Sequence, residues 1–182
     1  MKQLLASILF CLVGMTGTAQ SLRAGLEQDA LPWITGGYYA GGFVGTQHLR
    51  ARILTAYVHK PSLIVPKGFT NNTVTAWAFV GDYFLKEDWS GFWLSGGLVR
   101  WNSTIQSDTR IETAKYSQFL LNGSIGYQWL LGQHFYVSPW AGMHILIHGP
   151  TRITADGKSF KAPLLNPEAS LKFGWYFGGK SH

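Results

Sequence analysis

Hydrophobic and polar residues alternate in long segments from about residue 33 to the end of the chain. The clearest segment covers residues 115–131, where alternate positions are apolar and the positions between them are polar or small. The apolar set includes Phe119, Leu121, Ile125, Tyr127 and Trp129, and the other set includes Gln118, Asn122, Ser124 and Gln128. A period of two residues predicts a β-strand with one apolar and one polar face.

The same alternation predicts six further strands. They cover residues 49–59, 72–85, 134–148 and 168–177, together with 33–46 and 91–106, where glycines weaken the contrast between faces. Short turns at 86–90 and 131–133 separate some of the strands. Longer polar loops at 61–71, 107–112 and 150–163 separate others, and the last loop has a turn signal at 155–158. This rhythm is typical of a membrane barrel with short periplasmic turns and longer outer loops.

Seven strands are one too few for a barrel whose two ends lie on the periplasmic side. We expect the eighth to be a shortened first strand at residues 22–28, followed by a turn at Ala30-Leu31-Pro32. A short helix in this region, with a different strand pairing elsewhere, is the alternative. The predicted fold class is therefore all-β, a single antiparallel up-and-down transmembrane β-barrel of eight strands.

The first residues have the pattern of a secretory signal peptide. Lys2 precedes an apolar run at 4–13 and a small and polar stretch at 14–20. Cleavage after Ala19 would leave a barrel domain at residues 20–182 and no cysteine, since Cys11 is the only one. The apolar run is shorter than the ~20 residues that a spanning helix needs. We predict export to the bacterial outer membrane.

The composition indicates that part of the protein's surface does not face water. Charged residues make up 13% of the chain, compared with about 25% in ordinary soluble domains. The net charge of +6 is scattered along the chain without a basic run, so we do not expect a nucleic-acid partner. Six aromatic residues are predicted to anchor the barrel at the membrane interface: Trp77, Tyr83, Tyr127, Trp129, Trp175 and Phe177. A soluble, lipocalin-like barrel that carries a ligand in the periplasm is the alternative architecture.

Three segments resemble small uncharacterised bacterial outer-membrane β-barrel proteins: Gly81-Asp82-Tyr83-Phe84-Leu85, residues 135–142 (FYVSPWAG) and residues 166–177 (NPEASLKFGWYF). The closing segment also resembles the signal that the barrel assembly machinery reads, with Lys172, Gly174 and Phe177 in the usual spacing, although residues 178–182 follow it. The resemblance implies that outer-membrane lipids and the assembly machinery are partners of the chain. It implies no reaction or ligand, and it does not indicate an oligomeric state.

Several charged and titratable residues fall on the inward face of the predicted strands. They are Arg50, Arg52, Asp82, His144, His148, Glu168 and Lys172, and Glu27 and Asp29 could join them. Charges inside a narrow membrane barrel must be paired or hydrated. We interpret the set as a salt-bridge network that fills a lumen too narrow for a channel. A proton-transfer or ligand site is the alternative.

The same residues give little sign of metal or cofactor chemistry. His144 and His148 would lie about 13 Å apart on one strand, too far to share a metal ion. Ser138 or Ser170 could lie near His144, with Glu168 or Asp82 orienting it, as a lipid-modifying enzyme would require. However, no Gly-x-Ser-x-Gly motif is present. We therefore expect a barrel with a structural, binding or minor solute-passage role and no cofactor.

Overall fold

The structure is a computed structural model that describes residues 22–61 and 64–177. The predicted signal peptide lies outside these residues. The elements in chain order are β1 (Arg23–Asp29), α2 (Ala30–Ile34), β2 (Tyr38–Thr46), β3 (Leu49–His59), β4 (Phe69–Phe84), β5 (Gly91–Ser107), β6 (Thr113–Leu131), β7 (Phe135–His148), β8 (Arg152–Ala155), β9 (Lys158–Lys161) and β10 (Leu165–Phe177).

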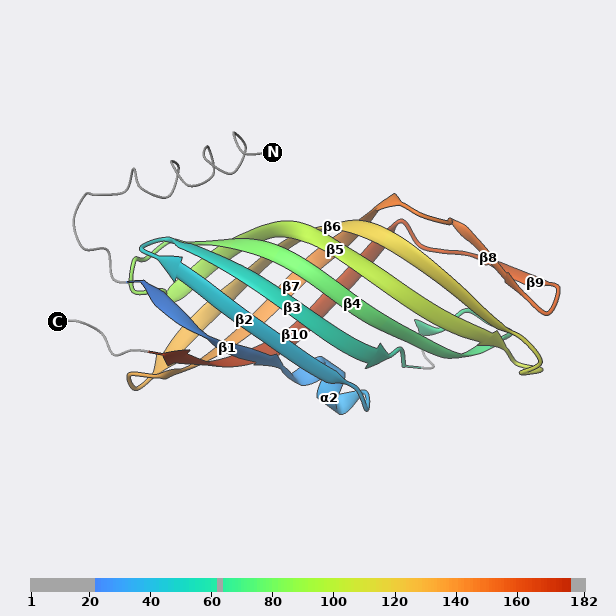
Figure 1. Ribbon diagram of the computed structural model, residues 1–182, viewed down its shortest axis with the longest axis horizontal. Helices are drawn as coiled ribbons and strands as arrows, with labels where there is room; N and C mark the ends of the chain where they lie inside the picture. The colour runs from blue at the N-terminus through green and yellow to red at the C-terminus, as the bar shows by residue number, and fades with distance from the viewer. Residues whose placement is uncertain (1–21, 62–63, 178–182) are drawn as a thin grey trace, which may run out of the picture.

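Eight of these strands close into an antiparallel barrel (Figure 1). Their order around the ring is β1-β10-β7-β6-β5-β4-β3-β2, so each strand pairs with the next barrel strand along the chain and β1 pairs with β10 to close the ring. The strands β8 and β9 form a separate hairpin. The predicted all-β, up-and-down barrel of eight strands is therefore confirmed, and the segment predicted as a shortened first strand is β1.

The connection after β1 differs from the prediction, because a short helix replaces the expected turn. Asp29 begins α2 as its N-cap, and its carboxylate accepts a hydrogen bond from the N–H of Leu31 at 3.0 Å. Asp is a favoured N-cap residue, and Pro32 fits within the first turn because an N–H there has no partner in the helix. The helix did not require a different strand pairing.

The two ends of the barrel differ in their connections. Tight turns join β2 to β3, β4 to β5 and β6 to β7 at what we call the short-turn end. The opposite, long-loop end carries α2, the longer loops and the β8–β9 hairpin, which projects beyond the barrel in Figure 1. Asp156 and Gly157 form the tip of this hairpin with positive φ angles of 50° and 71°. Two positive φ angles are typical of a two-residue hairpin turn, so the predicted turn at 155–158 is confirmed.

The outer wall of the barrel is apolar over most of its height. Large apolar side chains on every barrel strand point outward and stay exposed, among them Leu26, Val44, Ile53, Phe79, Leu98, Leu121, Ile145 and Phe173. A continuous exposed surface of this kind is unusual for a protein in water and marks contact with a membrane or another protein. Among residues 22–61 and 64–177, no helix is both long and apolar enough to cross a membrane.

Candidate functional site

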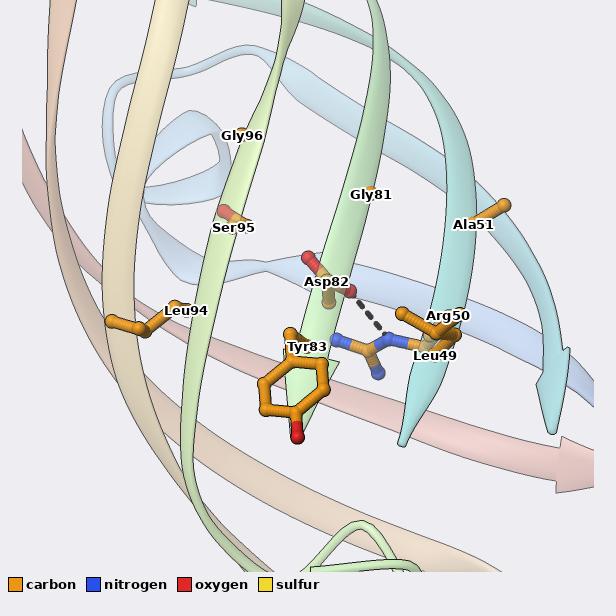
Figure 2. A pocket seen from close by; sticks show the side chains of 9 residues that line it. All are labelled: Leu49, Arg50, Ala51, Gly81, Asp82, Tyr83, Leu94, Ser95 and Gly96. Carbon is orange, nitrogen blue, oxygen red and sulfur yellow. Dashed lines mark hydrogen bonds and ion pairs between the residues drawn. The ribbon is translucent and has the colours of Figure 1, made fainter. Parts of the chain in front are cut away.

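A layer of buried charges crosses the lumen in its short-turn half. Arg50 on β3 and Asp82 on β4 are directly paired across the strands, and Arg50 Nε donates to Asp82 Oδ2 at 2.6 Å (Figure 2). Arg52 Nη2 donates to the other oxygen of the same carboxylate at 2.7 Å. The outer wall of the barrel beside this pair has a shallow hollow over Gly81 and Gly96. It is bordered by Leu49, Ala51, Tyr83 and Leu94.

Glu27 on β1 connects this layer to the rest of the ring. Its carboxylate accepts hydrogen bonds from Arg52 Nη1 at 2.7 Å, from the Tyr39 hydroxyl at 2.8 Å and from the Tyr136 hydroxyl at 2.5 Å. The residues Glu27, Arg50, Arg52, Asp82 and Lys172, which we call the charged layer, are all at most 4% exposed. Such charges persist in a protein interior because their hydrogen bonds and opposite charges replace water.

Lys172 is the least satisfied member of the charged layer. Its ammonium lies 3.7 Å from Glu27 Oε1, which is beyond hydrogen-bond distance, and 4.4 Å from the centroid of the Trp140 ring. The layer holds three cations and two carboxylates. The nearest further carboxylate, Asp29, is already engaged by Trp140 Nε1 at 2.8 Å and by the Ser170 hydroxyl at 2.5 Å. Lys172 is therefore the cation of the charged layer that has no hydrogen-bonded carboxylate.

Below the charged layer, a cluster of aromatic side chains fills the short-turn end. This aromatic layer consists of Phe43, Phe84, Trp89, Trp93, Tyr136 and Tyr176. Trp89 comes from the turn between β4 and β5, and it is fully buried because it folds back into the barrel. The carbonyl of Trp89 accepts from Gln128 Nε2 at 2.7 Å, and its indole N–H donates to the carbonyl of Gln47. The turn residue thus covers the end of the lumen.

Three of these aromatic rings each lie on a glycine of the neighbouring strand. The direct cross-strand pairs are Gly25 with Phe43, Gly126 with Trp93, and Gly174 with Tyr136. A Cβ atom at any of these glycines would come within 2.4 Å of the paired ring. Glycine is required there because only a residue without a side chain lets a large ring lie flat across the narrow lumen.

The long-loop half of the lumen instead contains a cavity of about 550 Å³. We call it the outer cavity. Its wall on β3, β4 and β5 is mainly aliphatic and consists of Leu54, Ala56, Val58, Val74, Ala76, Ala78, Val80 and Val99. Arg52 and Lys172 of the charged layer form its floor, and Pro61, Ile64, Phe160 and Ala162 border its upper end. A volume of this size is within the range of small-molecule sites.

The opposite wall of the outer cavity is polar. His144 on β7 lies 2.8 Å through Nε2 from Glu168 Oε2 on β10, and its Nδ1 is buried without a hydrogen-bond partner. The His144 ring lies 5.2 Å from the ring of Trp101, and the ammonium of Lys60 lies 5.0 Å from that Trp101 ring. Burial lowers the pKa of Lys60, although the Glu168 carboxylate opposes the shift.

The serine arrangement considered from the sequence is not formed. The Ser138 hydroxyl accepts from Trp93 Nε1 at 2.9 Å, and the Ser170 hydroxyl donates to Asp29. His144 does have Glu168 beside it, but no serine of the described residues hydrogen-bonds to its ring. Within the part of the chain that the structure describes, no group of three or more His, Cys, Asp and Glu side chains is placed to hold a metal ion.

The predicted inward direction of His148 was wrong. The register of β6 and β7 shifts between Phe119 and Leu120, so that Phe119 pairs with His148 and Leu120 with Leu146. Ile147 is the extra residue of this bulge, and a bulge reverses the alternation beyond it. His148 consequently lies exposed on the outer wall, with its ring 6.3 Å from the ring of Phe119. The other six residues of the predicted network lie inside the barrel, in two groups.

The six aromatic residues predicted at the membrane interface all lie on the outer wall. Tyr83, Tyr127, Trp129, Trp175 and Phe177 lie toward the short-turn end of their strands. Tyr127 packs edge to face on Phe92, at 4.9 Å between ring centroids. Trp77 lies in the middle of β4, directly paired with Arg100 on β5.

Sequence reasoning missed the aromatic layer and the outer cavity, although inward glycines opposite inward aromatic residues were a usable signal.

Comparison with known proteins shows similarity of fold but not of sequence. No protein-family model matches the chain, and no characterised protein matches it in sequence. The N-terminal β-barrel domain of Pseudomonas aeruginosa OprF is similar in structure, with a TM-score of 0.52 and 15% identity over 86% of this chain and 95% of that one. Neisserial surface protein A is also similar, with a TM-score of 0.54 and 8% identity over 86% of this chain and 94% of that one. At these identities the likeness shows a shared eight-stranded barrel fold.

Proposed function

We propose that this protein is an integral outer-membrane barrel that binds a small, largely apolar ligand with an acidic group in its outer cavity. Membrane residence is supported by the apolar outer wall and by the barrel fold shared with two outer-membrane proteins. A soluble lipocalin-like barrel is disfavoured because it would place its large apolar side chains inside rather than outside. The export signal and the family resemblance remain predictions from the sequence.

The lumen is better suited to binding than to transport. The charged layer and the aromatic layer together fill the short-turn half, and Trp89 covers its end. An eight-stranded barrel is only wide enough to be filled by its own side chains. A solute that enters from the long-loop end would therefore stop at Arg52 and Lys172.

The outer cavity is the observation that carries this proposal. Its aliphatic wall favours a hydrocarbon group, since apolar surface gains about 25 cal/mol for each Å² removed from water. Its floor holds Lys172, whose ammonium lacks a hydrogen-bonded carboxylate within a layer of three cations and two carboxylates. A carboxylate on the ligand would supply the missing charge. A medium-chain fatty acid has this chemistry.

The proposal can be tested with 11-(dansylamino)undecanoic acid, whose fluorescence increases in apolar sites. The purified protein in lipid nanodiscs is expected to bind the probe saturably, and decanoic acid is expected to displace it. Replacing Ala76 by Phe fills the outer cavity and should weaken binding by at least about tenfold. The matched control is Ala51→Phe, which places the same ring on the outer wall of β3. Equal binding by both variants would contradict the proposal.

The acidic group is tested separately with Lys172→Met. This variant should lower the affinity for decanoic acid about tenfold, since a hydrogen bond to a charged group is lost. It should leave the affinity for methyl decanoate nearly unchanged. If both ligands weaken equally, Lys172 does not select the acid. Single-channel recording addresses the pore alternative, and steady conductance steps would show that the lumen is open.

A further inference from the structure

Three strands of the outer wall change from apolar to polar at the same cluster of side chains. Along β5 the outward residues Phe92, Leu94 and Leu98 are followed by Arg100, and then by Asn102, Thr104 and Gln106. On β6, which runs in the opposite direction, the polar outward residues Thr113, Lys115 and Ser117 come first, and the outward residues are apolar from Phe119 onward. On β7 the change comes after Ile147, at His148. Such a change marks the upper edge of the apolar band of a membrane barrel.

The side chains at this edge contact one another. Arg100 and Phe119 are directly paired across β5 and β6, and the guanidinium carbon of Arg100 lies 5.6 Å from the centroid of the Phe119 ring. His148 is paired with Phe119 from the other side, with 6.3 Å between ring centroids. Arg100 and His148 therefore lie on either side of one exposed aromatic ring, at the edge of the apolar band.

The polar side chains just above this edge form hydrogen bonds with one another. Ser117 donates to Asn102 at 2.8 Å, and the hydroxyls of Thr73 and Thr104 lie 2.6 Å apart. Farther up, Gln106 hydrogen-bonds with both Asn71 and Thr113. The side chains of Arg100 and His148 make no hydrogen bond or ion pair with any described residue, and both lie against the ring of Phe119.

No Asp or Glu side chain of the described residues is placed as their counter-ion. The chain has nine Asp and Glu residues, all of them among the described residues, and none lies on the outer wall. They lie inside the barrel (Glu27, Asp29, Asp82, Glu168), in the β4–β5 turn (Glu87, Asp88) and in the connections of the long-loop end (Asp108, Glu112, Asp156). A cation at the edge of the hydrocarbon region needs an anion nearby. The described residues supply none here, so an anion that pairs with these side chains would come from the surroundings.

We propose that Arg100 and His148 bind the phosphate group of an outer-leaflet lipid of the lipid A type, whose first acyl carbons lie against Phe119 and Ile147. The planar guanidinium binds a phosphate through two parallel hydrogen bonds, and an imidazole N–H donates a third in either protonation state. The proposal rests on membrane residence, which is part of the proposed function, but it does not depend on the outer cavity.

Native mass spectrometry of the detergent-solubilised full barrel would test the site, with lipid A, phosphate-free lipid A and phosphatidylethanolamine as probes. The wild-type protein is expected to bind lipid A at least about tenfold more tightly than either of the other lipids. Arg100→Gln combined with His148→Gln should remove this preference, and Arg100→Lys should retain part of it. The control is Arg152→Gln, which removes an exposed cation from β8.

Three results would overturn the site. They are equal binding of the three lipids by the wild type, an unchanged preference in the double variant, and an equal loss of preference in Arg152→Gln. Heat-modifiable gel migration of each variant shows whether the barrel is folded. A folded barrel without lipid A preference would refute this inference alone, whereas a protein that does not enter membranes would refute the membrane residence on which it rests.

Discussion

The short-turn half of the lumen is filled, whereas the long-loop half holds a cavity, although both are built from the same eight strands. In the filled half, inward positions alternate between large rings, charges and the glycines that make room for them. In the other half, inward positions on β3 to β5 carry small and medium aliphatic residues. The strand framework is therefore compatible with either a packed or a hollow lumen, and the size of inward side chains decides between them.

The largest effect is expected in the charged layer. Replacing Glu27 by Gln removes the carboxylate that Arg52, Tyr39 and Tyr136 share, and leaves three cations with Asp82 alone. Breaking such a buried network costs about 3–5 kcal/mol in the free energy of unfolding. Urea unfolding in lipid vesicles, followed by heat-modifiable migration, measures this change. Glu87→Gln in the exposed β4–β5 turn is the control, and an equal effect of both variants would show that the layer does not stabilise the barrel.

A smaller effect is expected for overpacking in the aromatic layer. Replacing Gly174 by Ala puts a Cβ atom 2.4 Å from the Tyr136 ring, so the ring must move. Overpacking of this kind costs about 1–3 kcal/mol. Gly123→Ala is a matched control on the outer wall of β6, because nothing lies within 4 Å of the added atom. The same unfolding assay compares them, and similar stabilities would mean that the layer is loosely packed.

Added bulk should be tolerated in the outer cavity. Ala76→Phe is expected to change the free energy of unfolding by less than about 0.5 kcal/mol, although it should weaken probe binding, because the ring enters empty space. This is the reverse of the expectation for Gly174. A loss of more than 1 to 2 kcal/mol, which would be typical of overpacking, would show that the cavity is closed in solution.

The smallest effect concerns the hairpin above the cavity. Lys158 lies against Asp108, and Asp156 accepts from Ser107 and Thr109, so these contacts lower the pKa of both aspartates. A carboxylate with a lowered pKa stabilises the folded hairpin above its ordinary pKa of 3.8, and this contribution is lost as the pH falls through the lowered value. Hydrogen exchange of residues 152–161 should therefore become faster, relative to the intrinsic rate, only in acid. Unchanged protection would show that the two contacts do not hold the hairpin.

The strand pattern was predictable because a membrane barrel repeats it along every strand. Residues 49–59 were predicted with the bounds that β3 has, and the strand predicted at 134–148 begins one residue before β7. The inward direction of Arg50, Arg52, Asp82 and Lys172 follows from the same two-residue period. Alternation can be recognised within a single strand, so the direction of these side chains can be predicted without knowing the neighbouring strands.

What failed depended on contacts between strands. The bulge at Ile147 turned His148 outward, and nothing in the spacing along β7 reveals an extra residue. Trp89 was predicted only as part of a turn, but it folds into the lumen. There its indole N–H donates to the carbonyl of Gln47, and its own carbonyl accepts from the side chain of Gln128. The central place of Glu27 was likewise hidden, because its partners come from three other strands.

Glu27 also has a consequence for how the barrel is completed. It lies on β1, a strand of seven residues that forms the seam with β10, where the two ends of the sheet meet. Before the seam forms, β1 is already paired with β2, and β2 with β3, so Glu27 can reach Tyr39 and Arg52 from within the open sheet. Joining the two edges adds the partners on the other side of the seam, which are the hydroxyl of Tyr136 and the ammonium of Lys172. Completion of the backbone ring therefore also completes the surroundings of a buried carboxylate, so a barrel that stays open leaves Glu27 with only part of its partners.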